Sequence, residues 1–287
     1  MLRALMTVAL ILGSGASPEQ AKVKPAASKS PDRPFASESQ PSPDFDQQAE
    51  QQLLDMANKS RAEAGAAPLE FDEGLIQAAR AHAAAMAHEQ QLSHQLNGEP
   101  SLPHRLSAAS VLHLDHAGEN VALDLTPDQA HEHLMLSPPH RENLLDTNYN
   151  VAGFGVFRSG GRIYVVEDFG HSLPAYTPEQ TENAIVEAIS RARRAAHLPA
   201  LTRASDADLR PAVCTMAQQD RLGTRSMHEL AQRYSMVSYT NLHPEILPTS
   251  ANKAIENRAI KNVAVGACYA RTDTYPSGVY WIGLELY

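Results

Sequence analysis

Apolar residues at helical spacing begin near residue 45 and predict two successive helices. The first pattern runs from Leu53 to Ala64, has Asp44 or Asp46 as its N-terminal cap, and ends at Gly65. The second begins at Asp72-Glu73 and places an apolar stripe on one face. His82 lies in the middle of that stripe, so we predict a hydrogen-bonded core histidine there rather than a ligand.

The pattern changes after the second helix. Residues 95–117 have no clear period and are predicted to form loops. Thr126-Pro127 is a good helix start, with Thr as N-cap and Pro at the first helical position, and that helix ends by Ser137-Pro138. Two β-branched and aromatic runs, 151–157 and 162–169, flank a Gly-Gly turn and predict a β-hairpin. Helices before and between strands predict an α/β fold, a three-layer α/β/α sandwich.

The C-terminal half repeats this plan imperfectly. Leu201 follows Arg193 by eight residues, as Leu69 follows Arg61. Residues 206–222 predict a second helix, residues 262–269 resemble 150–157, and residues 279–286 predict a last strand. These likenesses predict a second copy of the first domain; an unrelated α/β cap domain is the alternative.

The second copy lacks the polar motifs of the first. It has no Gly-Glu-Asn, and Ser250-Ala-Asn-Lys253 stands roughly where Ser137-Pro-Pro-His140 stands in the first. We therefore predict a domain over residues 46–172 and a degenerate copy without the site over residues 173–287.

The N-terminus is typical of a secretory signal peptide. Arg3 precedes the apolar run 4–12, which is too short to span a membrane, and small residues follow up to Ala16. We expect a signal peptide over residues 1–21, a mature chain that begins near Ser17, and a flexible linker over residues 22–45, which are rich in Pro, Ser and charge. The protein is thus predicted to be secreted or periplasmic, without a transmembrane segment.

Composition excludes one class of partner. The 287 residues carry 24 basic and 33 acidic side chains, a net charge of −9, without a Lys/Arg run. A nucleic-acid partner is therefore not expected. The two cysteines, Cys214 and Cys268, are an even pair in an exported protein, which favours a disulfide; two buried free thiols are the alternative.

The segment from His94 to His140 concentrates the polar motifs. It holds Ser93-His94, Gly118-Glu119-Asn120 and Ser137-Pro-Pro-His140. Two histidines and a carboxylate so far apart must come from different elements if they meet at all. Such a set can hold a divalent ion such as zinc, do general acid–base chemistry, or form a polar cluster that fixes loops. The sequence leaves these three readings open.

The order of the motifs resembles the CAP superfamily (cysteine-rich secretory proteins, antigen 5, pathogenesis-related 1), specifically its bacterial SCP-domain branch. The resemblance covers roughly residues 46–172 and rests on Asn58-Lys-Ser-Arg61, Pro68-Leu69, His82, Ser93-His94, Gly118-Glu119-Asn120, Ser137-Pro-Pro-His140-Arg141-Glu-Asn143 and the Gly-Phe-Gly-Val hairpin. It implies a cleft lined by two His and two acidic residues, matched here by His94, Glu119 and His140. Ser137 stands where the second acid is expected.

The resemblance leaves the activity open. It implies a binding module for an envelope, lipid or other small ligand through His94, Glu119, Ser137 and His140. The alternative is a hydrolase, zinc-dependent or acid–base, in which His94, Glu119 and His140 are catalytic or hold the metal. No Gly-x-Ser-x-Gly or His-Glu-x-x-His motif is present, so a hydrolase would depend on those three residues alone.

Overall fold

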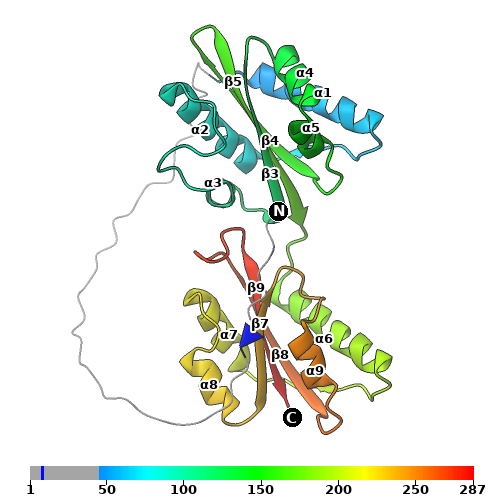
Figure 1. Ribbon diagram of the computed structural model, residues 1–287. Helices are drawn as coiled ribbons and strands as arrows, with labels where there is room; N and C mark the ends of the chain where they lie inside the picture. Colours follow the sequence, from blue (N-terminus) through cyan, green and yellow to red (C-terminus); the bar gives the residue numbers. More distant parts are fainter. Residues whose placement is uncertain (1–7, 10–44) are drawn as a thin grey trace, which may run out of the picture.

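The computed structural model describes residues 8–9 and 45–287, which form two mixed α/β domains (Figure 1). The first sheet has the strand order β2-β4-β5-β3 and the second the order β1-β7-β9-β8-β6. The chain passes from one to the other between β5, which ends at Leu173, and α6, which begins at Pro178. Apart from Val8–Ala9 (β1), which pairs with the edge of β7, the expected signal peptide and the linker up to residue 44 lie outside the described residues.

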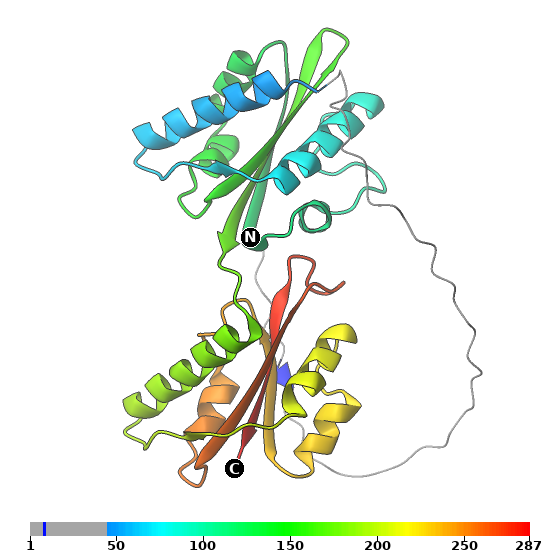
Figure 2. The same cartoon turned by 180° about the vertical axis from the view of Figure 1, so that it is seen from behind.

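The first domain is a three-layer sandwich (Figures 1 and 2). Helices α1, α4 and α5 cover one face of its sheet, and α2 and α3 cover the other. Its elements are α1 (Gln47–Glu63), β2 (Glu70–Phe71), α2 (Glu73–Glu89), α3 (Leu102–Ala109), β3 (His113–Asp124), α4 (Pro127–Leu136), α5 (Pro138–Leu145), β4 (Val151–Ser159) and β5 (Arg162–Leu173). The predicted sandwich is confirmed, with α1, α2, α4 and the β4–β5 hairpin at their predicted places.

Residues 95–117 differ from their prediction as loops. They contain α3 and the beginning of β3, so Glu119 and Asn120 lie on a strand. The residues after Ser137 also form a helix, α5, in which two prolines occupy the first turn. Prolines are tolerated there because the first-turn amides have no intrahelical acceptor. The proline pair thus follows the end of α4 and also begins α5, a helix that the sequence pattern does not predict.

The second domain has the same strand order and directions as the first. Its elements are α6 (Pro178–Ala195), β6 (Thr202–Arg203), α7 (Leu209–Gln218), α8 (Arg225–Ala231), β7 (Ser235–Asn241), α9 (Thr249–Ile255), β8 (Asn262–Ala270) and β9 (Val279–Leu286). The short β6 is parallel to β8, as β2 is to β4, and the remaining pairs are antiparallel in both sheets. Helices α6 and α9 cover one face and α7 and α8 the other.

A Glu–Arg pair and a buried arginine of the first helix repeat between the domains. Glu50 on α1 binds Arg80 on α2, and Glu182 on α6 binds Arg210 on α7 in the same two-pronged manner. The helical arginines named in the sequence comparison repeat as well. Arg61 donates to the carbonyl of the sixth residue after it, Ala67, at 2.8 Å, and Arg193 donates to that of Pro199 at 2.5 Å. The second domain therefore repeats the Glu–Arg pair and the buried helical arginine of the first.

The strand alignment proposed from sequence is wrong by one residue. Gly155 packs on the backbone of Arg80, where an added Cβ would lie 2.4 Å from the Arg80 nitrogen. In the second domain Gly266 meets the backbone of Arg210, with the corresponding distance 3.1 Å. The register thus aligns Gly155 with Gly266, whereas the sequence alignment had placed it opposite Ala267. Close approach of helix and sheet at these two glycines, closer at Gly155 than at Gly266, indicates the register.

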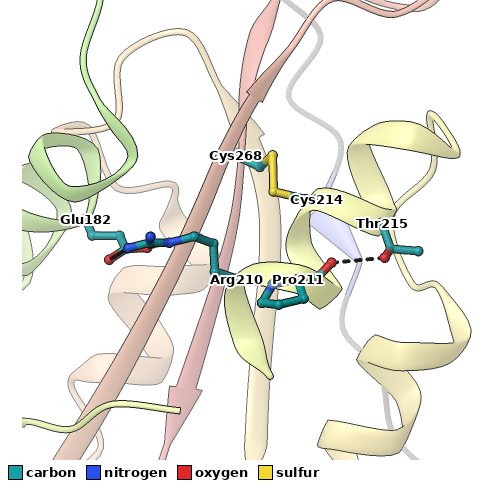
Figure 3. The surroundings of a disulfide bond; sticks show 6 residues. All are labelled: Glu182, Arg210, Pro211, Cys214, Thr215 and Cys268. Atoms are coloured by element: carbon teal, nitrogen blue, oxygen red, sulfur yellow. Dashed lines mark hydrogen bonds and ion pairs between the residues drawn. A yellow bond between two sulfur atoms is a disulfide. The ribbon is translucent and has the colours of Figure 1, made fainter. Parts of the chain in front are cut away.

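Cys214 on α7 and Cys268 on β8 form the disulfide that the sequence favoured (Figure 3). Their Cα atoms lie 5.2 Å apart. The bridge ties α7 to its sheet close to the Glu182–Arg210 pair. Within the described part of the chain, no helix has the length and hydropathy that a membrane crossing requires.

Candidate functional site

The candidate site lies over the edge strand of the first sheet. Strand β3 is the last in the order β2-β4-β5-β3, and its successive residues point to opposite faces. Glu119 points to the face covered by α2 and α3, and Asn120 points to the face covered by α5. His94, in the loop after α2, and His140, on α5, approach from these two faces, and their ring centres lie 6.3 Å apart.

Each imidazole is held through its Nδ1 atom. His94 Nδ1 lies 2.9 Å from Oε1 of Glu119, and His140 Nδ1 lies 2.8 Å from Oγ of Ser137. Among the described residues, the Nε2 atom of neither ring has a hydrogen-bond partner. The His94 side chain is 57 % exposed. The structure thus brings His94 to Glu119 and His140 to Ser137, and places the two rings beside each other.

The two histidines have opposite pKa shifts. The hydrogen bond that His94 donates to the Glu119 carboxylate, together with the charge of that carboxylate, raises the pKa of His94 above its usual value. Burial lowers the pKa of His140, and the neighbouring His94 lowers it further. Relative to a free imidazole, the site therefore shifts His94 toward its protonated form and His140 toward its neutral form.

Glu119 is engaged on both of its oxygens. Oε2 accepts a hydrogen bond from Nη2 of Arg105 on α3, while Oε1 binds His94. Arg105 also lies 3.4 Å from Glu99, whose other oxygen lies 2.7 Å from Nδ1 of His82. Glu119 is 6 % exposed and Arg105 9 % exposed, so this is a buried ion network. Its role in the geometry is to fix Glu119, and through Glu119 the ring of His94.

His82 is the hydrogen-bonded core histidine that its position on α2 predicted. It is fully buried, and Nε2 lies 2.9 Å from the carbonyl oxygen of Ser93. That contact ties α2 to the loop that carries His94. Glu99 and Arg105 were missed by sequence reasoning because they lie in the segment without a period, and no local signal marked them.

On the opposite face, Asn120 ties α5 to the strand. Its amide nitrogen donates to the carbonyl oxygen of His140 at 3.0 Å and to Oε2 of Glu167 at 3.1 Å. Asn143 donates to Asn120 and to the backbone of Glu119. These bonds fix the backbone of His140 relative to Glu119.

A second buried carboxyl group lies directly across the strand pair from Glu119. Asp168 on β5 is its register partner in the β3–β5 ladder and is fully buried. Burial, followed by the charge of Glu119, raises the pKa of Asp168 well above its usual value. Two like charges directly opposite each other on a sheet repel. Burial next to a second carboxyl group therefore favours the neutral form of Asp168.

Glu167 gives the site a measurable pH dependence. Burial raises its pKa from 4.5 to about 7, against the hydrogen bond from Asn120. The folded state therefore holds this proton more tightly than the unfolded chain. The stabilising contribution is complete below pH 4.5 and is lost as the pH rises toward 7. Glu167→Gln keeps an uncharged side chain at every pH, so it should be near neutral at pH 4 and stabilise at pH 8 by about 1–3 kcal/mol.

Urea unfolding followed by circular dichroism at pH 4 and pH 8 measures this difference. The matched control is Glu132→Gln, on the exposed side of α4. A Glu167→Gln effect that is equal at the two pH values would contradict the assignment.

The three-ligand metal set expected from sequence is not assembled. Both oxygens of Glu119 are taken by His94 and Arg105, and no contact joins Glu119 to His140 among the described residues. The part of the chain that the structure describes contains no group of three or more His, Cys, Asp or Glu arranged to hold a metal ion. The residues present offer a cation two imidazoles and no carboxylate. Glu119 holds the ring of His94 and is held in turn by Arg105.

The second domain has lost the corresponding side chains. The β7–β9 register places Met236 at the position of Glu119 and Val237 at that of Asn120, while Glu285 stands at that of Asp168. Glu285 is fully buried, and burial raises its pKa to about 7. The polar site predicted for the first copy alone is thus absent from the second sheet, where a single buried carboxyl remains.

The fold and the ordered motifs define the class of the first domain. Residues 54–169 match the family model described as CAP, the cysteine-rich secretory protein family. The first domain of this chain is a CAP domain.

Two proteins of Bacillus subtilis (strain 168) are similar to part of this chain. The protein named "Uncharacterized protein YkwD" is 31% identical over 112 residues, 39% of this chain. The protein named "Uncharacterized membrane protein YlbC" is 34% identical over 111 residues, 38% of this chain. The chain spans 43% and 32% of their lengths, less than half of each.

Among solved structures, an extracellular protein from Bacillus anthracis that contains an SCP domain is similar. It is 25% identical, with a TM-score of 0.41, and the match covers 44% of this chain and 41% of that one.

Proposed function

We propose that the CAP domain is an extracytoplasmic binding module whose two imidazoles contact the polar head group of an envelope lipid. The observation that carries the proposal is the setting of these rings. Both are held through Nδ1 while Nε2 is left without a protein partner, and Glu119 is occupied by Arg105. A carboxylate consumed in a buried network is available as an orienting group rather than as a base. The chemistry left at the surface is hydrogen bonding by His94 and His140.

Exposed apolar side chains favour an amphiphilic ligand. Leu92, two residues before His94, is 47 % exposed, and Leu136, next to Ser137, is 72 % exposed. These are two of the large apolar side chains that the described residues leave to solvent, and each adjoins one half of the site in sequence. A head group at the imidazoles with its chain along Leu92 and Leu136 would satisfy both features. The secretory N-terminal pattern supports a location where envelope lipids are accessible.

The test uses sedimentation with phosphatidylglycerol vesicles, and phosphatidylcholine vesicles as the comparison. His94→Ala and His140→Ala should each weaken binding at least about tenfold, since each removes a direct hydrogen bond to a charged group. Exposed His88 on α2 gives the matched control, and His88→Ala should bind as the wild type does.

His82→Ala separates binding from stability. Loss of this buried ring should lower the free energy of unfolding by about 1–3 kcal/mol, because Glu99 and the Ser93 carbonyl lose their partner. The folded fraction should still bind vesicles better than His94→Ala does, because both imidazoles of the site remain. Equal vesicle binding by wild type and His94→Ala would overturn the proposed function.

A second candidate is an acid–base hydrolase. Its support is the pair of opposite pKa shifts, which makes His94 the proton donor and His140 the proton acceptor. In this candidate the two imidazoles could hold a zinc ion, which would supply Lewis-acid chemistry when bound. Stoichiometric zinc in the purified protein, lost in His94→Ala, together with hydrolysis of an ester substrate, would favour this candidate over the binding module.

A further inference from the structure

We propose that Arg271 of the second domain is a positioning residue for the site of the first domain. Its guanidinium donates three hydrogen bonds across the domain boundary. Nη1 binds the carbonyl oxygens of Ser107 at 2.7 Å and Ser110 at 2.6 Å, and Nη2 binds that of Leu112 at 2.7 Å. These three carbonyls belong to the end of α3 and to the turn that leads into β3.

The place of these contacts connects them to the site. The last carbonyls of a helix have no intrahelical donor, and a cation there is favourable for the helix dipole. Arg271 supplies both for α3. Helix α3 carries Arg105, which binds Glu119, and Glu119 holds His94. The first domain thus receives the C-terminal capping group of a site-bearing helix from its partner domain.

The second domain also holds β3, the strand that carries Glu119. His113, the first residue of β3, stacks on Tyr269 with ring centres 3.7 Å apart. Asp115 on β3 lies 3.3 Å from Nε2 of His243, which follows β7. Both partners of the Arg105–Glu119 ion pair are therefore on elements anchored by the second domain.

The end of β8 is itself rigidly placed. Tyr269 and Arg271 follow Cys268 within three residues, and Cys268 is bridged to α7. The Tyr269 hydroxyl donates to the carbonyl of Ser277 at 2.8 Å. A domain that has lost its own polar site thus retains a braced segment directed at the site of its neighbour. We assign the second domain the role of setting α3 against β3, and with it the place of Glu119.

Hydrogen exchange in the full chain tests the inference without reference to any ligand. Arg271→Ala should speed amide exchange in residues 102–112 and at the start of β3 by about tenfold or more, because three charged hydrogen bonds are lost. Arg271→Lys, which keeps the charge and one donor group, should restore part of the protection. The control is Arg225→Ala on α8, whose side chain is 93% exposed and pairs only within its helix.

A second readout distinguishes positioning from general support, and it rests on the proposed function. Arg271→Ala should weaken binding of phosphatidylglycerol vesicles as Arg105→Ala does, and the double variant should be no weaker than Arg105→Ala alone, since both act through Glu119. Additive losses would overturn the inference, as would exchange in Arg271→Ala equal to that in Arg225→Ala. If the wild type does not bind these vesicles, the proposed function fails, and the exchange comparison alone decides the inference.

Discussion

Replacement of Arg61 by alanine is expected to destabilise the first domain by about 3–5 kcal/mol and leave the second domain unchanged. The Arg61 side chain is fully buried and donates to four backbone carbonyls, those of Ala67, Leu144, Asp146 and Tyr149. These carbonyls lie in the segments that follow α1 and α5. Removal of the guanidinium leaves the buried carbonyls of Leu144 and Tyr149 without this donor, while the carbonyl of Asp146 keeps the amide of Tyr149.

The single tryptophan makes the two domains separable in this experiment. Trp281 lies buried on β9, so its fluorescence reports the second domain, while circular dichroism reports both. Arg61→Ala should lower the urea midpoint at which the first domain unfolds, as followed by circular dichroism. It should leave the midpoint of the Trp281 fluorescence transition unchanged. Arg193→Ala, the matched control, should do the reverse. Loss of the fluorescence transition in Arg61→Ala would show that the domains unfold together and would contradict the prediction.

Removal of the disulfide should have the second-largest effect, and in the other domain. The bridge joins residues 54 positions apart. A closed loop of that length stabilises by about 4 kcal/mol in the chain-entropy account. The Cys214→Ala/Cys268→Ala variant should therefore lower the urea midpoint of the Trp281 fluorescence transition by an amount that dithiothreitol reproduces in the wild type.

Two comparisons check this prediction. The double variant should not respond to dithiothreitol, and the transition of the first domain should stay where it is in the wild type. If two free thiols are titrated in denatured wild-type protein that has not been reduced, the bridge does not form and the prediction fails.

Long elements with a regular apolar period could be predicted from the sequence, and short or polar ones could not. Helices α1 and α2 have caps at Asp46 and Asp72 and a buried stripe, and both begin where expected. Helix α3 has eight residues, too few for a period to emerge. Strand β3 could not be predicted because Glu119 and Asn120 are two successive polar residues, which interrupt the alternation of apolar and polar residues expected of a strand. The two elements that the apolar period did not predict, α3 and β3, are those that carry Arg105 and Glu119 of the site.

The candidate site was partly foreseeable for a related reason. The order of the motifs pointed to His94, Glu119 and His140, and the structure places the two rings side by side. The order of the motifs could not show that Arg105 would bind the second oxygen of Glu119, since that contact depends on how α3 packs on β3. Asp168 was equally hidden, because its meaning comes from cross-strand register and not from its neighbours in sequence.

Gly155 in the first sheet and Gly266 in the second should differ in how well they tolerate substitution. An added Cβ at Gly155 would lie 2.4 Å from backbone atoms of Ala79 and Arg80, which cannot move without shifting α2. At Gly266 the nearest atom is a side-chain carbon of Leu209 at 2.9 Å, which can rotate away. In a library of random substitutions, Gly155 should be nearly invariant among folded variants, while Gly266 should accept alanine. At this position the contact between helix and sheet therefore restricts the sequence of the first domain more than that of the second.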